Sequence, residues 1–422
     1  MLLSLLTAFL SLFQQSAPPP MPGAAIYAQL AAGRYLSALA EAELTEGIDE
    51  PGSILADTHG LVLSYLSLER ETLAVFDAMG GGGAQAPLAS SPLDTAEALD
   101  AIPAIVTAAQ GRRVVILNES HHMPRHRAFA AELAGALRAE GFTWFGAETF
   151  ADIAGTVERG YPSAQTGYYV QDPVFGELVR TVLDLGYRTF PYEVEEHLPP
   201  GADTRTRINH RETHQARNIV QRCFEVDPEA RVFLYVGYSH ATEHWSDRGG
   251  PTETAWMAAR LRELTGHDPL TIDQTVTSPR STPATSDPHW RRAAEAGKLA
   301  TPRIFRAQDG QPLVVGQYAG QVDLQVFHPP LGELHGRPDW LARGRTALAL
   351  PPEFLGALEE GRRFLAQAFR ADEPDTAIPS DQFVLVPGAR AAQFLLVPDA
   401  YRLRLMDEDG EVLVRVEKVE VR

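Results

Sequence analysis

The chain has 422 residues, of which 44% are hydrophobic and 22% charged, and its formal net charge is −18. This length exceeds what one hydrophobic core usually organises, so we expect two or three globular domains. The acidic charge argues against a nucleic-acid partner, because phosphate backbones are bound by clusters of Lys and Arg. The single cysteine, Cys223, excludes an internal disulfide and any metal site built from several cysteines.

An apolar run, MLLSLLTAFLSLF, opens the chain. It is shorter than the about 20 residues that span a bilayer, and it has the length of the hydrophobic part of a signal peptide. Small residues follow it at Ser16 and Ala17, although the first basic side chain is Arg34. A buried N-terminal helix or a misassigned start codon are the alternatives. We expect residues 1–23 to be a signal peptide and the protein to be periplasmic or secreted, without a stable membrane anchor.

Residues 24–80 are expected to form a helical subdomain. Apolar side chains recur at helical spacing in Ile26–Glu43 and again in Leu61–Met79. The segment GRYLSALAEAE resembles half of a tetratricopeptide hairpin, and an ordinary helical subdomain is the alternative, because repeat arrays generally need about three units. Residues 81–100 begin with Gly and contain several Pro and Ser, which predicts a linker.

Residues 101–275 predict an α/β domain with a central parallel sheet flanked by helices. Short apolar runs, typical of strands buried on both faces, alternate with amphipathic helical stretches. The expected strands are Val114–Leu117, Trp144–Ala147, Thr189–Tyr192, Val232–Val236 and Leu270–Ile272. The expected helices are Arg125–Ala139, Phe175–Leu185, His210–Phe224 and Thr252–Leu264. Successive strand–helix–strand units of this kind form parallel sheets with right-handed crossovers.

The C-terminal part divides into two segments. Residues 276–350 are rich in Pro, Ser, Thr and His with weak periodicity, and we expect an irregular extension. Residues 351–422 are expected to form a small antiparallel β module, because alternating stretches are separated by Pro-Gly, Pro-Asp and Asp-Gly turns. Its expected strands are Gln382–Val386, Gln393–Val397, Tyr401–Met406 and Val412–Val421.

Polar side chains follow four of the predicted parallel strands. Ligands bind outside the carboxyl ends of such strands, so these side chains are expected to share one site. The expected catalytic residues are Glu119, His121, Glu148 and His240, and Glu193 and Tyr238 are expected to support them. Carboxylates and imidazoles are also ligands of divalent metals, so the same four residues are alternatively a metal site.

Three further residues near these strand ends are ambiguous. His121 is preferred over His122, because it lies two residues after Glu119 and so on the same side of an extended segment. Glu212 lies on the apolar face of its helix, where it is either paired with an Arg or part of the site. His126 opens a helix after Pro124 and is either a satisfied core or cap residue or a supporting residue of the site.

The segment VVILNESHHMPRHRAFAAELAGALRAEGFTWFGAETF resembles the opening of the ChaN-like haem-binding family, which belongs to a wider superfamily with the erythromycin esterases and the Tiki and TraB proteases. Later segments are similar to further motifs of the family in the same order: RETHQARNI, VFLYVGYSHATEHW and MAARLRELTG. Carried over residue by residue, the resemblance implies a polar site made of Glu119, His121, Glu148, Arg211, Glu212 and His240. The sequence departs from the family where Asn118 and Ser239 stand for Gly and Glu212 stands for Asp.

Three functions compete. In a hydrolase, His121 or His240 would act as a general base on water and Glu119 or Glu148 would orient it, with or without a divalent metal. The substrate would be a small molecule or peptide with an ester, lactone or amide bond. In a haem- or iron-binding protein, which the resemblance implies, phenolate ligands are available from Tyr168, Tyr169, Tyr192 and Tyr238.

A serine hydrolase is the third possibility. Gly237-Tyr238-Ser239-His240-Ala241 follows a strand and nearly makes the Gly-x-Ser-x-Gly elbow, with Asp273 and His289 later in the chain. Ala241 breaks the pattern, and no HGGG-like oxyanion segment precedes it, so this function is the least favoured.

Overall fold

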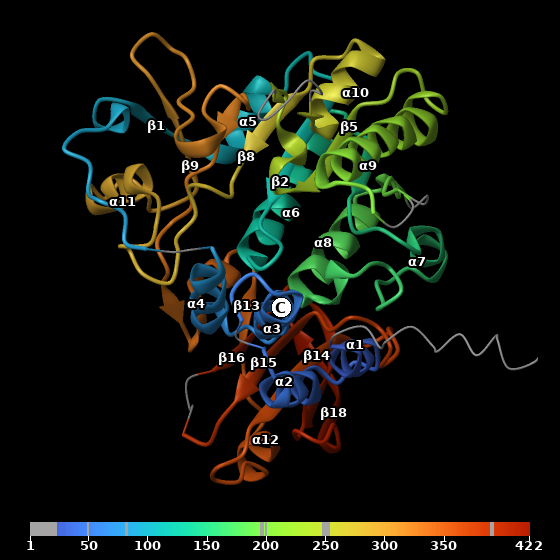
Figure 1. Ribbon diagram of the computed structural model, residues 1–422. Helices are drawn as coiled ribbons and strands as arrows, with labels where there is room; N and C mark the ends of the chain where they lie inside the picture. The colour runs from blue at the N-terminus through green and yellow to red at the C-terminus, as the bar shows by residue number, and fades with distance from the viewer. Residues whose placement is uncertain are drawn as a thin grey trace, which may run out of the picture.

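The computed structural model describes residues 23–48, 50–80, 83–194, 198, 201–246, 254–388 and 392–422. In Figure 1 the central sheet and its helices fill the upper part of the molecule, and the N-terminal helices and C-terminal strands lie together below them. The expected signal peptide lies outside the described residues, except for Gly23. Among the described residues, no helix is long and apolar enough to cross a membrane.

The central sheet contains six parallel strands in the order β10-β8-β2-β5-β3-β4. They are β2 (Val114–Glu119), β3 (Trp144–Ala147), β4 (Arg188–Phe190), β5 (Val232–Gly237), β8 (Leu270–Asp273) and β10 (Leu324–Gln325). The first five confirm the expected strands of the α/β domain. The sixth strand, β10, lies in the segment expected to be irregular. It was not predicted, because two residues are too few to show a periodic pattern.

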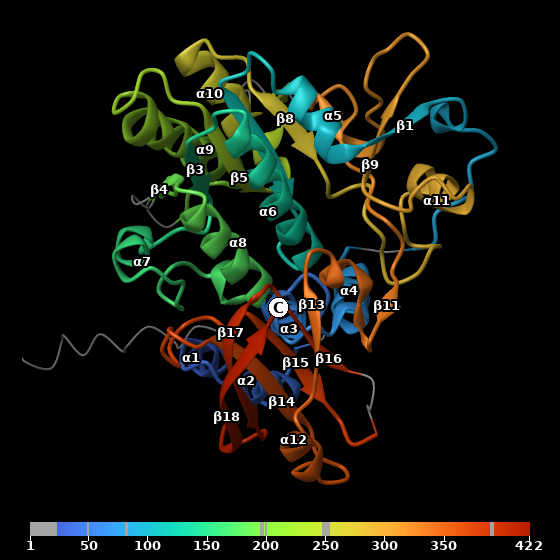
Figure 2. The ribbon, with the colours of Figure 1, turned by 180° about the vertical axis from the view of Figure 1, so that it is seen from behind.

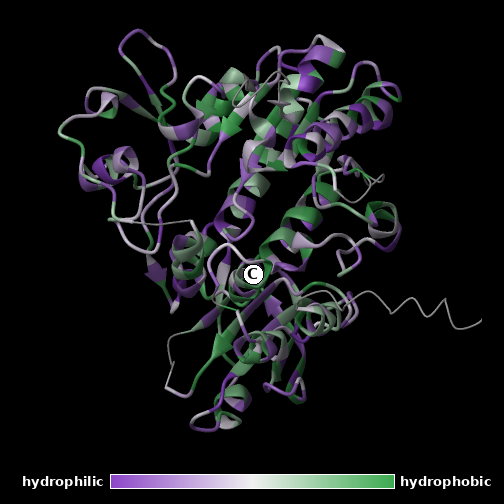
Figure 3. Cartoon of the chain, viewed as in Figure 1, coloured by the Kyte–Doolittle hydropathy of each residue, from purple (hydrophilic) through white to green (hydrophobic). Residues whose placement is uncertain are grey.

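Helices cover both faces of this sheet, as the α/β class requires. Successive residues of a strand point to opposite faces. Val115 and Leu117 therefore pack on one side, and Val114 and Ile116 pack on the other. The first side is covered by α5 (Ala101–Ala108), α6 (Pro124–Ala139) and α8 (Pro173–Asp184), and the second by α9 (Thr204–Ile219) and α10 (Met257–Thr265). In Figure 3 the strands of the central sheet are largely hydrophobic and α9 is largely hydrophilic.

Two helix starts differ from the sequence expectation. The helix expected at His210–Phe224 begins at Thr204, because the Asp203 side chain accepts a hydrogen bond from Thr206 N at 2.7 Å and caps an earlier turn. Its last residues, Val220–Phe224, form a π-helical turn. The helix expected at Thr252–Leu264 begins at Met257. Helix α7 (Ile153–Arg159) was not expected from the sequence.

The N-terminal helices and the C-terminal β module share one core. Leu365 and Met406 pack against α1 (Ala24–Ala31), α2 (Tyr35–Leu44), α3 (Ile54–Tyr65) and α4 (Glu69–Met79). The β module has the order β15-β14-β17-β18, with strands β14 (Phe364–Arg370), β15 (Asp381–Leu385), β17 (Asp399–Met406) and β18 (Val412–Val421). Both views show these sequence-distant regions side by side (Figures 1 and 2).

The remaining elements are short. The opposite face of the β module is covered by β13 (Thr346–Ala349), β16 (Gln393–Leu396) and α12 (Pro352–Gly356). The expected linker contains β1 (Glu97–Asp100), which pairs antiparallel with β9 (Arg303–Arg306), and α11 (Pro288–Glu295) packs beside them. Two further pairs are β6 (Trp245–Ser246) with β7 (Thr254–Ala255) and β11 (Glu333–Leu334) with β12 (Arg337–Pro338).

Candidate functional site

Three adjacent strands carry the expected catalytic residues. Because β5 lies between β2 and β3, the carboxyl ends of these strands meet at one edge of the sheet. Glu119 ends β2, Glu148 follows β3, and His240 lies in the short helical turn after β5. The structure therefore brings Glu119, His121, Glu148 and His240 together, in two clusters that meet at Gly237.

The first cluster surrounds His121. Its Nδ1 lies 2.9 Å from Glu119 Oε1. Arg127 donates to both oxygens of Glu119, from Nε at 2.9 Å and from Nη2 at 3.1 Å, and Tyr235 donates to Oε2 at 2.8 Å. The Arg127 side chain has no solvent exposure, and its Nη1 also donates to Asp172 at 2.7 Å. Glu119 is thus fixed by three donors besides His121.

The charge of Glu119 is maintained by this cluster. Burial alone would raise the pKa of its carboxyl group, but Arg127 and His121 outweigh burial and lower the pKa to about 2. Glu119 is therefore ionised at neutral pH and accepts the Nδ1 proton of His121. In neutral His121 that leaves Nε2 as the nitrogen with a free lone pair. The ring is held between Tyr169, stacked at 4.0 Å, and Tyr238, edge-on at 5.1 Å.

Gly237 joins the two clusters. A Cβ atom at this position would lie 2.7 Å from His121 Nε2 and 2.8 Å from Glu148 Oε2. Both atoms therefore occupy the space above the end of β5 that a side chain at position 237 would need. Glycine here permits a close approach of the imidazole and the carboxylate to the backbone.

The second cluster surrounds His240, which is buried. Its Nδ1 lies 2.7 Å from Glu212 Oε2, and its Nε2 lies 3.5 Å from Glu148 Oε1. Glu212 also accepts a hydrogen bond from Met257 N at 2.8 Å, and Glu148 Oε2 accepts one from Gly237 N at 2.6 Å. Glu212 therefore lies in the second cluster, in contact with His240.

His240 is a cation in this environment. Burial alone would lower its pKa, but the carboxylates of Glu148 and Glu212 outweigh burial and raise the pKa to about 10. The same pairing holds the pKa of Glu148 well below its ordinary value, against the effect of burial. Arg211 Nη1 lies 3.2 Å from His240 Nε2, which is a hydrogen bond only when that nitrogen is unprotonated. When His240 is protonated, its Nε2–H and the Nη2–H of Arg211 both point toward Glu148 Oε1.

Arg211 and Glu193 lie at the open side of the second cluster. Arg211 donates to Glu148 from Nη2, and to Glu193 from Nη2 and, at 3.0 Å, from Nε. Gln215 Nε2 donates to the same carboxylate at 3.0 Å. The side chains of Arg211 and Glu193 are 39% and 30% exposed, against 18% for His121, so solvent reaches the site here.

The other expected supporting residues have different surroundings. His126 is buried, accepts a hydrogen bond from Ser120 N at 3.0 Å and contacts Ser278 Oγ at 2.8 Å, so it supports the loop after β2 without facing the catalytic groups. Tyr238 is one of three non-glycine residues with a positive φ among the described residues, at 39°, and is 37% exposed. Its backbone conformation is strained, and such strain is concentrated at functional sites.

Sequence reasoning missed Arg127, Asp172 and Tyr235. Arg127 follows His126 in α6, but nothing in its local sequence distinguishes it from a surface arginine. Asp172 caps α8 by accepting a hydrogen bond from Val174 N at 3.2 Å, and Tyr235 occupies an ordinary apolar position of β5. Only the predicted burial of the whole face of α6 could have indicated that Arg127 needs buried anionic partners.

The donor set does not fit a metal ion. Both oxygens of Glu119 bind Arg127, and the oxygens of Glu148 bind Arg211 and Gly237 N. Within the described ranges, no group of three or more His, Cys, Asp or Glu side chains is arranged to hold a metal ion. The phenols expected as iron ligands are unsuited to ionisation, because burial raises the pKa of each one: Tyr168, Tyr169, Tyr192 and Tyr238.

The serine-hydrolase arrangement is not formed. Ser239 Oγ lies 3.1 Å from the Tyr318 hydroxyl. Asp273 accepts hydrogen bonds from Asn118, Thr275 and Gln325, and His289 Nδ1 lies 2.8 Å from Ser91 Oγ. The single cysteine is also unsuited to nucleophilic attack, because Cys223 is buried and burial raises the pKa of its thiol to about 12.

Comparisons with known proteins identify no family. No family model matches the chain, and its sequence matches no curated protein. Its structure is similar to the type III effector HopBA1, with 10% identity, a TM-score of 0.32, and coverage of 58% of this chain and 96% of that one.

Two further solved structures are similar. RRSP, a MARTX toxin effector domain from Vibrio vulnificus, is 14% identical with a TM-score of 0.30, covering 49% of this chain and 42% of that chain. The C-terminal region of Pasteurella multocida toxin, described with a thiol-protease-like catalytic triad, is 10% identical with a TM-score of 0.33, covering 82% and 51%. Similarities this weak carry no inference about activity.

Proposed function

We propose that the chain is a hydrolase of ester, lactone or amide bonds, in which His121 acts as a general base on water. One observation carries the proposal. His121 is oriented through Nδ1 by an ionised carboxylate, its Nε2 lies above Gly237 at the ends of the central strands, and its side chain is 18% exposed. Activation of water requires a general base, a carboxylate that orients the base, and space for a water molecule beside it.

The proton moves through His121 in this proposal. Nε2 takes a proton from the attacking water, the resulting imidazolium is stabilised by Glu119, and Nε2 then gives the proton to the leaving group. Arg127 fixes both oxygens of Glu119, so the carboxylate keeps one orientation during the cycle.

In this proposal Arg211 is the accessible cationic donor of the second cluster, in which three carboxylates accompany two cations. A carbonyl attacked by water develops negative charge on its oxygen, and fixed cations lower the energy of that state. Arg211 and the imidazolium of His240 are the cations nearest to Glu148, and the side chain of Arg211 is accessible. The resemblance supports a hydrolase through the erythromycin-esterase branch of the superfamily, whereas its ChaN branch implies haem binding.

The test is a panel of ester, lactone and peptide substrates with the wild type and His121→Asn. We expect kcat/KM to fall by about 10²–10⁴ in the variant, with a melting temperature that is unchanged or slightly raised. His335→Asn is the matched control, because His335 is exposed and distant in sequence from the site. The proposal fails if the wild type turns over no substrate, or if His121→Asn retains full activity.

We also propose that the chain acts outside the cytoplasm, on the strength of its N-terminal apolar run. N-terminal sequencing of native protein should find a start between residues 17 and 27. Recovery of native protein with Met1 intact would contradict export.

A further inference from the structure

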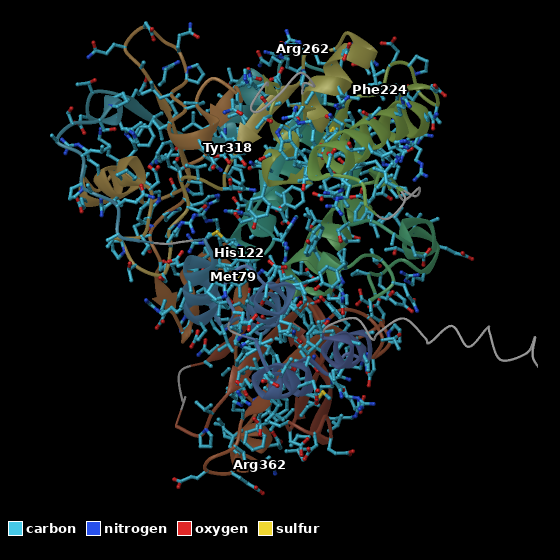
Figure 4. The ribbon with its side chains drawn as sticks, in the orientation of Figure 1. Met79, His122, Phe224, Arg262, Tyr318 and Arg362 are labelled. Atoms are coloured by element: carbon cyan, nitrogen blue, oxygen red, sulfur yellow. The ribbon has the colours of Figure 1, made fainter. Side chains whose placement is uncertain are left out.

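A cavity of about 270 Å³ adjoins the His121 cluster. One wall comes from α4, with Leu73, Phe76 and Met79, and the opposite wall from the loops after β2, β5 and β8. Figure 4 shows His122 and Met79 next to each other where α4 meets the α/β domain. The N-terminal helical region therefore contributes directly to a space beside the candidate catalytic residues.

The walls of this cavity are largely apolar. Leu73, Phe76, Met79 and Met123 line it, and the His122 ring is stacked on Phe76 at 3.7 Å with an angle of 9° between the planes. Burial and nearby cations lower the pKa of His122 to about 3, so its ring is neutral and adds an aromatic surface without charge. Such walls bind apolar groups by excluding water from both surfaces.

Two charged side chains, Asp77 and Arg280, lie in the cavity wall, and they differ in how many of their polar atoms form hydrogen bonds. Asp77 accepts hydrogen bonds from Ser281 N at 3.0 Å, Ser281 Oγ at 2.5 Å and Thr285 Oγ1 at 2.9 Å. Arg280 Nη1 donates to Asp77 at 3.1 Å, which uses one of five N–H groups of a side chain that is 45% exposed. The cavity therefore has apolar walls and an accessible guanidinium among its lining groups.

Tyr238 connects this cavity to the proposed base. Its ring lines the cavity and lies edge-on to His121, with ring centroids 5.1 Å apart. Its hydroxyl lies 3.4 Å from His122 Nδ1. A molecule in the cavity that contacts Tyr238 is thus one aromatic ring away from His121.

We propose that this cavity binds the apolar chain of the substrate, and that Arg280 binds a carboxylate carried by that chain. The inference rests on the proposed function for its catalytic meaning, but binding is measurable without turnover. The volume is slightly below the about 300 Å³ at which typical ligand pockets begin, so the chain is short. The substrate class is an ester, lactone or amide of a short aliphatic acid that carries a second carboxylate.

The experiment is isothermal titration calorimetry of the full chain with hexanoate and with hexanol. The wild type should bind hexanoate more tightly than hexanol. Met79→Trp, which fills the cavity from the end of α4, should weaken binding of both probes by about tenfold or more. Arg280→Gln should weaken hexanoate by roughly fivefold and leave hexanol unchanged, because an exposed ion pair contributes modestly.

Matched controls separate local from general effects. Leu44→Trp places the same side chain at the exposed end of α2, and Arg70→Gln removes an exposed arginine of α4; both should bind like the wild type. The proposal is overturned if the wild type binds neither probe, or if Met79→Trp binds both as tightly as Leu44→Trp. Hexanoate binding without hydrolysis of any substrate would instead leave the cavity assignment standing and remove the proposed function.

Discussion

His121 and His240 each bind a carboxylate through Nδ1, at 2.9 Å and 2.7 Å, but their second nitrogens have different surroundings. His240 Nε2 lies 3.5 Å from Glu148 Oε1 inside a buried cluster. His121 Nε2 lies above Gly237 on the side of Glu148 Oε2, and its side chain is 18% exposed. The carboxylates of Glu148 and Glu212 stabilise the protonated form of His240, so this residue stays positively charged at neutral pH. One carboxylate orients His121 and leaves a nitrogen for chemistry. The difference shows that a histidine's role is decided by its second partner.

The largest expected effect comes from breaking the support of His121. In Arg127→Leu, the carboxylates of Glu119 and Asp172 remain buried without their shared cation. Loss of one partner of a buried ion pair costs about 3–5 kcal/mol of unfolding free energy, which urea denaturation would measure. Arg70→Leu removes a surface pair whose arginine is 59% exposed, and should cost less than about 1 kcal/mol. Equal losses in the two variants would contradict the account.

The second effect concerns pH and the other histidine. Because its folded-state pKa is raised to about 10, His240 contributes stability that is fully present below its ordinary pKa of 6.5 and is lost as pH rises through 10. We expect roughly 2–4 kcal/mol of the unfolding free energy to be lost across this window. His240→Gln should lack this part of the pH dependence. The same pH profile in wild type and variant would show that His240 is not the cation.

A third, smaller effect tests the contact between the clusters. In Gly237→Ala the added methyl group would meet His121 Nε2 and Glu148 Oε2 at less than van der Waals distance. Overpacking of this kind costs about 1–3 kcal/mol and should displace both side chains, so turnover should fall as well. Gly135→Ala in α6 is the control, since open space surrounds that position and helix propensity should make the variant slightly more stable. A fully active Gly237→Ala would contradict the close approach of the two clusters at this position.

The sequence predicted the parallel sheet because its strands are continuous apolar runs that end in polar residues. Glu119, Glu148 and His240 could be placed at one edge by the rule for strand ends alone. The order of the strands was not predicted, and neither was β10, which has two residues. The packing of the N-terminal helices on the C-terminal β module was also missed, because it joins residues far apart in the chain. Strand β14 was not among the strands expected from the sequence.

The pairs that the site residues form with one another could not be predicted from the sequence either. Spacing favoured His121 near Glu119, yet the partner of His240 depended on α9 crossing the end of β5 and delivering Glu212. Arg127 could not be recognised, because its partners Glu119 and Asp172 come from two other elements.

The most direct test of the central claim needs no substrate. Diethyl pyrocarbonate modifies accessible unprotonated imidazoles, and peptide mass spectrometry locates each modified histidine. At neutral pH we expect carbethoxylation of His121 and protection of His240, which is buried and protonated between Glu148 and Glu212. Prior incubation with hexanoate should slow the reaction of His121. Modification of His240 while His121 stays unmodified would contradict the assignment of His121 as the base.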